Sequence, residues 1–337
     1  MQLKPSHLIS FDARFAQNQH QFARKQIPGS EKIIFKQKFI DRYSKLTNWE
    51  LFKKYSLSFL RKSVRVNTLK ISVAELRKRM PKDWVFEQVP WCSEGFWIEH
   101  KKGRLDIGNT IEHCLGYIYV QESASMIPPI ILEPKPGERI LDVAASPGSK
   151  TTQISQMMRN EGAIFANDIT GDRLAALGIN LQRVGAKNCA ITQMRGEQFG
   201  NTGIEFDKIL LDAPCSGTGT IRKSLKTIEM WNPDMVRRLS NTQKALIASA
   251  FKALRSGGTL VYSTCSNEPE ENEGVIDWLL GKFTNAKLQE ISLDIKRSPT
   301  ILEFEGKSYN PEIGKCLRIW PQDNDTEGFF VAKILKE

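Results

Sequence analysis

The sequence lacks the features that mark membrane, secreted and zinc-binding proteins. No apolar run approaches the ~20 residues that a membrane-spanning helix needs. Residues 1–5 have neither the apolar core nor the small-residue cleavage site of a secretory signal. The six cysteines are scattered, without a Cys-x-x-Cys pair at zinc-ligand spacing. Free thiols of this kind fit a reducing cytoplasm. We therefore expect a cytoplasmic protein with no membrane partner and no metal.

Histidine is scarce, and a dinucleotide fingerprint is missing. The chain has four histidines, and His7 and His20 near its start have no partner at metal-ligand spacing. No Gly-x-Gly-x-x-Gly motif follows the first strand expected in the main domain, and Gly217-Thr218-Gly219 comes too late in the chain to serve as one. The sequence therefore disfavours a nicotinamide-dependent enzyme.

The composition is that of a basic globular protein. A chain of 337 residues, 40% hydrophobic and 26% charged, is long enough for two domains of ordinary size. Its net charge of +10 suggests a polyanionic partner, most commonly nucleic acid, although a basic surface also serves solubility alone. Lysine and arginine are dense in residues 14–82, which locates the expected contact before the main sheet. This group includes Arg61, Lys62, Arg65, Lys70, Arg77, Lys78 and Arg79.

Composition and periodicity divide the chain into three regions. Residues 1–30 are polar and are expected to form an extension that is helical in part. Residues 31–108 are predicted to form a helical plus small α/β domain, and residues 109–337 the second domain. Within residues 31–62 an aromatic stripe recurs at three- and four-residue spacings, which predicts helices that bury it in a core rather than use it to stack on bases.

The small α/β domain is predicted from short alternating strands around one helix. Ser72 can cap that helix. Trp91, Phe96 and Trp97 can stack on bases or pack in the core, and we expect packing for at least two of them. The predicted strands cover residues 64–70, 84–88 and 95–99, and the helix covers residues 73–80.

Strands and helices alternate from Pro136 onward. This pattern predicts an α/β fold with a doubly wound, mostly parallel sheet and right-handed crossovers. Gly185 and Gly257-Gly258 are expected where helices stop, and a hairpin is expected over residues 315–336. The predicted strands are 139–143, 163–167, 190–193, 208–211 and 259–263, and the predicted helices lie near 150–160, 171–184, 232–255 and 270–282.

Two of these strands end in a turn that carries a cysteine. A short apolar run ends in Asp212, and Ala-Pro then leads to Cys215; the strand over residues 259–263 is followed by Cys265 in Ser-Thr-Cys-Ser. Ligands of open α/β sheets bind outside the carboxyl ends of the strands, so both thiols can face one crevice. Taken alone, the first stretch also fits an ordinary loop with a buried cysteine. A third stretch, residues 140–152, passes from strand through small residues into a helix.

Together these three stretches resemble the RNA (cytosine-5)-methyltransferases of the Fmu/Sun family. Those enzymes use S-adenosylmethionine and two cysteines, one in a Pro-Cys turn and one in a Thr-Cys turn. The resemblance runs from about Val64 to the C-terminus, and Asp-Ala-Pro-Cys-Ser-Gly combined with Ser-Thr-Cys-Ser is more specific than either motif. It implies a Rossmann-like class I methyltransferase domain behind a small RNA-binding domain with an RNA-recognition-like fold.

The loop of the third stretch is the expected cofactor site. Its small residues allow a ligand close to the backbone, and the next helix offers free N–H groups to a carboxylate. The family's Cys-Ala-Ala-Pro-Gly-Gly-Lys-Thr appears here with small-for-small changes. Asp168 is expected to bind the ribose hydroxyls, although it also fits a helix cap, and the residue that reads the adenine stays open between Gln193 and another. The expected cofactor-binding residues are Ala144, Ala145, Ser146, Pro147, Gly148, Ser149, Lys150, Asp168, Arg173, Gln193 and Asp212.

The resemblance also implies the catalytic residues. Cys265 in the Thr-Cys turn is expected to attack carbon 6 of cytosine, and Cys215 in the Pro-Cys turn to help release the product. Asp212 is expected to bind the ring edge, most usefully when protonated. Lys150 is expected to lower a thiol pKa or hold Asp212, or to be structural. The histidine that usually precedes the closing hairpin is Gln322 here.

The predicted function is therefore methylation of carbon 5 of a cytosine in RNA, with tRNA preferred to rRNA because one small accessory domain accompanies the catalytic one. Two alternatives remain at this point. A DNA cytosine methyltransferase would attack from Cys215, and an RNA-binding or assembly factor would keep the fold without activity. The expected cofactor is S-adenosylmethionine and the expected partner is RNA. The oligomeric state stays open, with a monomer favoured.

Overall fold

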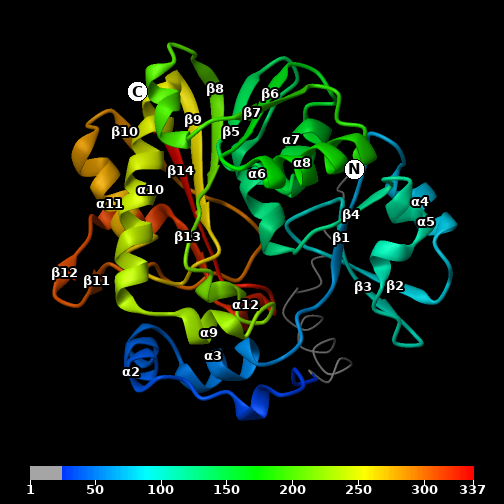
Figure 1. The fold of residues 1–337 in the computed structure, drawn as a ribbon, viewed down its shortest axis with the longest axis horizontal. Coiled ribbons are helices and arrows are strands. Elements are labelled where there is room, and N and C mark those ends of the chain that lie inside the picture. Colours follow the sequence, from blue (N-terminus) through cyan, green and yellow to red (C-terminus); the bar gives the residue numbers. More distant parts are fainter. Residues whose placement is uncertain (1–24) are drawn as a thin grey trace, which may run out of the picture.

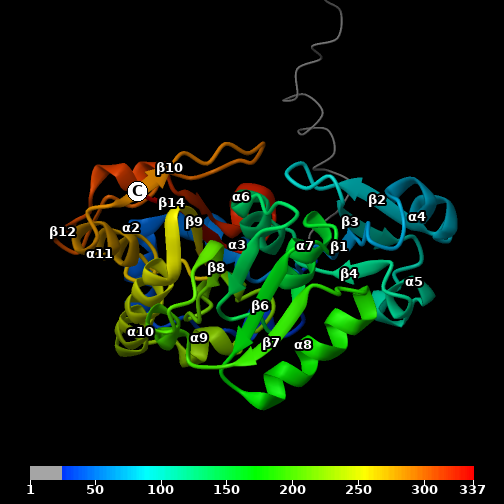
Figure 2. The ribbon, with the colours of Figure 1, turned by 90° about the horizontal axis from the view of Figure 1, so that it is seen from above.

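The computed structural model describes residues 25–337. The first 24 residues, with His7 and His20, lie outside the described residues, so the expectation for the N-terminal extension concerns residues that are mostly not described. Figure 1 shows a large sheet with helices on both sides and a smaller sheet beside it, and Figure 2 shows the same arrangement from above. No helix in residues 25–337 is long and apolar enough to cross a membrane.

The large sheet confirms the predicted doubly wound fold. Its strand order is β10-β14-β9-β8-β5-β6-β7, with β13 paired to β14. The five central strands run parallel, whereas β14 and β10 are antiparallel additions at one edge. The strands are β5 (Arg139–Asp142), β6 (Ala163–Asp168), β7 (Cys189–Gln193), β8 (Phe206–Asp212), β9 (Leu254–Thr264), β10 (Ala286–Gln289), β13 (Leu317–Ile319) and β14 (Phe329–Lys336).

Alternate residues of the central strands build two separate cores. Leu141, Ile209 and Leu211 point to the face covered by the long helix α10, whereas Ile140 and Leu210 point to the opposite face. Because both faces are covered, these strands read as nearly continuous apolar runs. The helices of this domain are α6 (Ile127–Leu132), α7 (Ser149–Met157), α8 (Gly171–Val184), α9 (Lys226–Met230), α10 (Pro233–Ala253), α11 (Glu273–Lys282) and α12 (Pro321–Asn324).

One predicted helix end was wrong. Gly185 does cap α8 in the left-handed conformation, but α10 ends at Ala253, ahead of Gly257-Gly258. The two glycines lie instead in β9, where the pairing with β8 shifts register. A Cβ at Gly258 would lie 2.8 Å from the carbonyl oxygen of Arg255, so the irregular strand needs a glycine there.

The small sheet has the order β2-β3-β1-β4. It contains the predicted strands, and Ser72 caps α4 in a capping box with Glu75. Its edge strand β4 pairs with β1, so residues beyond the predicted boundary at 108/109 still belong to this sheet. The elements are β1 (Ser63–Val66), α4 (Val73–Arg79), β2 (Trp84–Gln88), β3 (Gly95–His100), α5 (Ile111–Cys114) and β4 (Ile118–Val120).

Two expectations about RNA contacts are settled by burial in this domain. Trp91, Phe96 and Trp97 are all buried, so all three pack rather than stack on bases. Arg65 is also buried, and it donates hydrogen bonds to Gln121 and other polar side chains, so it does not belong to the expected basic surface.

The helices α2 (Gln37–Leu46) and α3 (Trp49–Ser56) form a separate aromatic cluster against the domain of the large sheet. They lie below the large sheet, next to α9 and α12 (Figure 1). As predicted, their aromatic stripe is core: the rings of Phe39 and Tyr43 stack with centroids 4.0 Å apart, and Trp231 and Trp320 of the large-sheet domain complete the cluster. The predicted closing hairpin is also present, as β13 paired with β14.

Candidate active site

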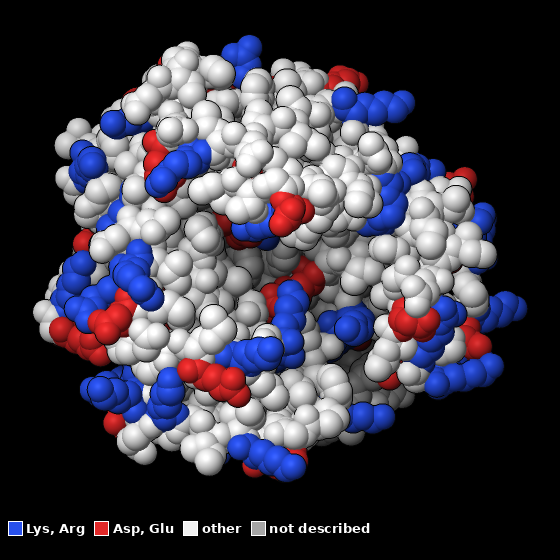
Figure 3. Space-filling model, viewed as in Figure 1, with Lys and Arg blue, Asp and Glu red and all other residues white. Residues whose placement is uncertain are grey.

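The two predicted catalytic cysteines meet at the carboxyl ends of adjacent strands. Since β8 and β9 run parallel with Asp212 opposite Ser263, the turns after them leave the sheet side by side. Cys215 Sγ lies 3.4 Å from Cys265 Sγ, and both residues are partly exposed. Figure 3 shows one face of the molecule, which is hollowed at its centre, with acidic and basic side chains on the walls of the hollow.

Backbone contacts fix the two turns to each other. Ala213 N–H donates to the carbonyl of Ser263, and Gly219 N–H donates to the carbonyl of Cys265, each at 2.9 Å. A Cβ at Gly219 would lie 2.2 Å from the carbonyl oxygen of Gly328 and 2.7 Å from that of Cys265. The loop after the Pro-Cys turn therefore closes over the second cysteine only because glycine stands there.

Lys150 and Asp212 form an ion pair beside the cysteines. Lys150 Nζ lies 2.6 Å from Asp212 Oδ2, and Ser263 donates to Asp212 Oδ1 at 2.7 Å. Burial acts to lower the pKa of Lys150, but the attraction of Asp212, followed by those of Cys265 and Asp142, raises it above its usual value. The sequence suggested a protonated acid in a dry pocket; in the structure the side chain of Asp212 is partly exposed and contacts a lysine.

The surroundings of Cys215 favour its thiol form. A hydrogen bond with Cys265 is the largest cause that raises its pKa well above the usual value, followed by burial and the charge of Cys265. Because a thiolate is the reactive form of cysteine, this shift disfavours Cys215 as the attacking group. Attack by Cys265 stays a prediction of the resemblance.

The loop between β5 and α7 has the shape of a small-molecule cradle. Gly148 adopts a left-handed conformation with φ of 103° and offers no side-chain cap to the first N–H groups of α7. A Cβ at this position would lie 2.9 Å from Leu177 Cδ1. Small residues and a free helix N-terminus fit the amino-acid end of S-adenosylmethionine. The predicted loop residues, Ala144, Ala145, Ser146, Pro147, Gly148, Ser149 and Lys150, lie between Asp142 and the start of α7.

Asp168 ends β6 beside this loop. Its Oδ2 accepts a hydrogen bond from Ser146 N–H at 3.3 Å and lies 3.4 Å from Arg173 Nη2, while its Oδ1 accepts from Ile169 N–H at 2.8 Å. Gln193 stands opposite Asp168 on β7 and donates to the carbonyl of Ile169. The structure thus brings the predicted ribose and adenine residues to one edge of the loop, and Asp168 also supports the turn into α8.

Sequence reasoning missed several buried acids near these residues. Burial raises the pKa of Asp142 to about 7, against the opposing effect of the hydrogen bond from Thr151. Glu327 pairs with Lys223 at 2.6 Å, and burial likewise raises its pKa to about 7. The position of Asp142 at the end of β5 was a sequence signal that could have identified it as an acid of the site. Lys223 and Glu327 are 104 positions apart in the sequence, so nothing in the sequence pointed to their ion pair. No group of acids, histidines and cysteines within residues 25–337 fits a metal ion.

Comparison with protein-family models shows which family this chain belongs to. The family model described as 16S rRNA methyltransferase RsmB/F matches residues 129–335, more than half of the chain. The model of the N-terminal domain of 16S rRNA methyltransferase RsmF matches residues 35–123. The chain belongs to the RsmB/F family. This is the family that the sequence resemblance indicated, and its members are S-adenosylmethionine-dependent RNA (cytosine-5)-methyltransferases.

Named relatives of this RsmB/F protein include enzymes of both tRNA and rRNA. It is 48% identical over 300 residues to a tRNA (cytosine(49)-C(5))-methyltransferase of Pyrococcus abyssi, covering 89% of this chain and 96% of that one. It is 44% identical over 281 residues to a ribosomal RNA small subunit methyltransferase F of Shewanella oneidensis, covering 82% of this chain and 57% of that one. The chain therefore spans little more than half of the second relative.

Solved structures agree with the fold. A methyltransferase homologue from Pyrococcus horikoshii has a TM-score of 0.82 at 38% identity, and the match covers 92% of this chain and all of that chain. NSun6 from the same organism, solved with SFG, an analogue of S-adenosylmethionine, has a TM-score of 0.79 at 27% identity over 90% of this chain and 98% of that one. The family uses S-adenosylmethionine, and the cradle described above fits that group.

We expect Asp168→Asn to weaken S-adenosylmethionine binding about 10- to 100-fold, because a hydrogen bond to a charged group contributes roughly 1.5–3 kcal/mol. Isothermal titration with S-adenosylmethionine measures the change. Asp172→Asn is the matched control, since Asp172 is an exposed acid in the first turn of α8, and it should bind as the wild type does. Unchanged binding in Asp168→Asn would mean that Asp168 serves the turn alone.

Proposed function

We propose that this methyltransferase modifies carbon 5 of a cytosine in tRNA through a covalent bond between Cys265 Sγ and carbon 6 of the base. The observation that carries the proposal is the 3.4 Å approach of Cys215 Sγ and Cys265 Sγ at the ends of two adjacent parallel strands. Carbon 5 of cytosine is a weak nucleophile, and a thiolate that adds to carbon 6 makes it enamine-like. The reaction is thus covalent catalysis by an activated nucleophile.

In this proposal each side chain of the site has a defined role in the reaction. Cys265 adds to carbon 6, and the electron pair of the ring double bond moves toward carbon 5. When bound, S-adenosylmethionine supplies an electrophilic methyl group. Once Cys265 is bonded to carbon 6, Cys215 releases its own proton to solvent, and its thiolate then accepts the proton of carbon 5. The electron pair of that C–H bond restores the ring double bond as the bond from carbon 6 to Cys265 breaks, which restores the thiolate of Cys265. Asp212 accepts a hydrogen bond from the exocyclic amine, and Lys150 offsets the negative charge that develops at ring nitrogen 3.

The cofactor is proposed to lie in the cradle between β5 and α7. Its carboxylate would meet the first turn of α7, and Asp168 would accept hydrogen bonds from the ribose hydroxyls. The exposed side chain of Arg173 lies against the same edge through its contact with the carbonyl of Ser146. Gln193, exposed at the end of β7, is the proposed contact for the adenine.

Similarity to a relative named for tRNA supports tRNA over rRNA as the substrate. This chain is 48% identical to the Pyrococcus abyssi relative that is named for tRNA, and 44% identical to the Shewanella oneidensis relative that is named for ribosomal RNA. Basic residues on the exposed surface of the small domain, including Arg77, Lys78, Lys101 and Lys102, are the proposed contacts for the tRNA backbone.

Methylation assays with defined RNAs test the substrate. The protein with tritiated S-adenosylmethionine should label a tRNA transcript pool at least about tenfold faster than 16S rRNA or small-subunit particles, and bisulfite sequencing should then identify the modified cytosine. Position 49 is the first site to inspect, because the Pyrococcus abyssi relative is named for it. Label confined to 16S rRNA would make the rRNA alternative correct, and label in DNA alone would overturn the RNA proposal.

A further inference from the structure

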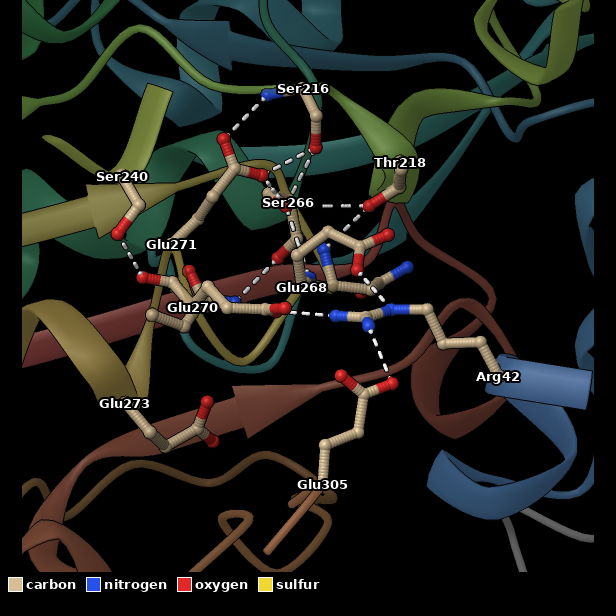
Figure 4. Close-up of polar contacts among 12 residues, drawn as sticks. Arg42, Ser216, Thr218, Ser240, Ser266, Glu268, Glu270, Glu271, Glu273 and Glu305 are labelled. Atoms are coloured by element: carbon tan, nitrogen blue, oxygen red, sulfur yellow. Dashed lines mark hydrogen bonds and ion pairs between the residues drawn. The ribbon is translucent and has the colours of Figure 1, made fainter. Parts of the chain in front are cut away.

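The loop that follows the second cysteine is acidic and buried. Residues 267–273 read Asn-Glu-Pro-Glu-Glu-Asn-Glu and connect β9 to α11. Glu268, Glu271 and Glu273 have no exposed surface at all. Buried carboxylates are costly unless they are paired or hydrogen-bonded, so each of them has a structural partner to identify. Figure 4 shows that the glutamates of this loop point in different directions, toward different parts of the molecule.

Two of these glutamates hold distant elements together. Glu268 accepts hydrogen bonds from Arg42 at 2.7 Å, and from Tyr43 and Trp231 at 2.8 Å each, which ties the loop to α2 and to the C-terminal end of α9. The carboxylate of Glu273 accepts hydrogen bonds from Nε and Nη2 of Arg318 on β13, at 2.8 and 2.6 Å. Neither carboxylate is hydrogen-bonded to a cysteine turn, so both explain the position of the loop but not the geometry of the thiols.

Glu271 is bonded to both cysteine turns. Its Oε1 accepts from Ser216 N–H at 2.9 Å and from Gln243 Nε2 at 3.0 Å. Its Oε2 accepts from the hydroxyl groups of Ser216 and Ser266. Ser216 directly follows Cys215, and Ser266 directly follows Cys265. One carboxylate therefore receives hydrogen bonds from the residue after each thiol.

Further contacts make this attachment rigid. Ser216 and Ser266 lie 3.0 Å apart through their hydroxyl oxygens, so the two turns also contact each other directly. Gln243 of α10 donates to the carbonyl of Pro214 at 2.9 Å as well as to Glu271, which adds a second link to the Pro-Cys turn. Tyr262 of β9 donates to the backbone carbonyl of Glu271 at 2.6 Å. The backbone of Glu271 is thus fixed by Tyr262 while its carboxylate binds the two cysteine turns.

We propose that Glu271 is a positioning residue that sets the separation of the two catalytic thiols by binding Ser216 and Ser266 together. The inference rests on the proposed two-cysteine mechanism and adds to it a residue that does not touch the substrate. Glu271 acts through the two serines, and a displacement of either turn changes the 3.4 Å contact between Cys215 and Cys265. Because near-attack geometry governs covalent catalysis, such a displacement lowers the rate more than the binding of substrates.

The chemical character of the carboxyl makes glutamine the informative substitution. Burial raises the pKa of Glu271 to about 7, and the hydrogen bonds of Ser216 and Ser266 oppose that rise. Glutamine keeps the size of the side chain but turns one acceptor oxygen into an NH₂ donor. Glutamine at position 271 therefore cannot accept hydrogen bonds from all the groups that donate to the carboxylate. Its similar size leaves no cavity in the surrounding core.

Steady-state kinetics of Glu271→Gln test the proposal. We expect kcat to fall about 10- to 100-fold with KM for S-adenosylmethionine and RNA within about threefold of wild type, and we expect the thermal midpoint to change by no more than a few degrees. Iodoacetamide should also alkylate Cys265 at a different rate in Glu271→Gln than in the wild type, and mass spectrometry of the alkylated protein measures that rate. Glu270→Gln is the matched control, because Glu270 lies in the same loop, pairs with Arg42 and has a partly exposed side chain. It should have wild-type kinetics.

A second set of variants tests the proposed path through the serines and does not depend on the stability of Glu271→Gln. Ser216→Ala with Ser266→Ala should reproduce the loss of kcat, and adding Glu271→Gln to this pair should cost less than about threefold more, since the three changes break one network. Additive losses, or a wild-type kcat in Glu271→Gln, would overturn the proposal. Activity retained in Cys265→Ala would overturn the proposed function and this inference with it, whereas an inactive Cys265→Ala beside a fully active Glu271→Gln would overturn this inference alone.

Discussion

A Cys265→Ala protein should bind S-adenosylmethionine like the wild type and lose methyl transfer by roughly 10³-fold or more. The reason is that no other group in the site takes over the addition to carbon 6. Cys215 loses its hydrogen bond with Cys265 in this variant, but burial still raises its pKa, so it remains a weakly nucleophilic thiol. Loss of a covalent nucleophile costs several orders of magnitude in enzymes that depend on one.

Tritium release from RNA labelled at carbon 5 of cytosine measures this effect, and calorimetry with S-adenosylmethionine confirms that the cofactor site is intact. Cys114→Ala is the control, since Cys114 is an exposed thiol at the end of α5; it should keep full activity. If Cys265→Ala stays active and Cys215→Ala does not, the two roles are reversed and the enzyme attacks from its Pro-Cys turn, as DNA cytosine methyltransferases do.

The parts of this fold that were predictable are those determined locally. Strands β5 and β8 are buried on both faces, so their apolar runs stand out in the sequence. Ser72 and Gly185 mark the ends of helices through their own conformations and hydrogen bonds. The meeting of Cys215 and Cys265 was predictable for a related reason: each cysteine lies in the turn after a strand, and neighbouring parallel strands end at the same edge of the sheet.

What was not predictable depends on partners that are distant in the sequence. Arg42 and Glu268 are 226 positions apart, and Ser216 and Glu271 are 55 apart. A run of glutamates reads as a solvated loop unless its buried partners are known, which is why the positioning role of Glu271 was not visible. Arg65 was assigned to a basic surface for the same reason, because its burial depends on Gln121 and Thr152.

The buried acids anchor the loop that follows the second cysteine, whereas part of the site is accessible to solvent. Glu268 and Glu273 attach this loop to α2 and β13. Asp212, which pairs with Lys150, has a partly exposed side chain. Breaking a buried pair such as Arg42 with Glu268 leaves an uncompensated charge, at a cost of roughly 3–5 kcal/mol. The scaffold behind the thiols is therefore much harder to deform than the surface that receives the base.

The second large effect is expected in Cys215→Ala, which should accumulate RNA joined covalently to Cys265. In the free enzyme, the hydrogen bond with Cys265 is the largest cause that raises the pKa of Cys215, and the charge of Cys265 adds to it. Once Cys265 Sγ is bonded to carbon 6, it is no longer an anion, so both causes disappear and only burial and more distant acids remain. Cys215 then loses its proton more readily and becomes a base at the step in which carbon 5 must lose its own proton.

Without Cys215 this last step slows while the first one continues, so the adduct builds up. Incubation with tRNA and S-adenosylmethionine followed by a denaturing gel should retard at least about half of the Cys215→Ala protein, and essentially none of the wild type. The double variant with Cys265→Ala is the matched control and should form no adduct, because it has no nucleophile. A retarded band in the double variant would mean that another residue attacks the ring. Fast turnover without adduct in Cys215→Ala would mean that the 3.4 Å contact between the thiols does not serve product release.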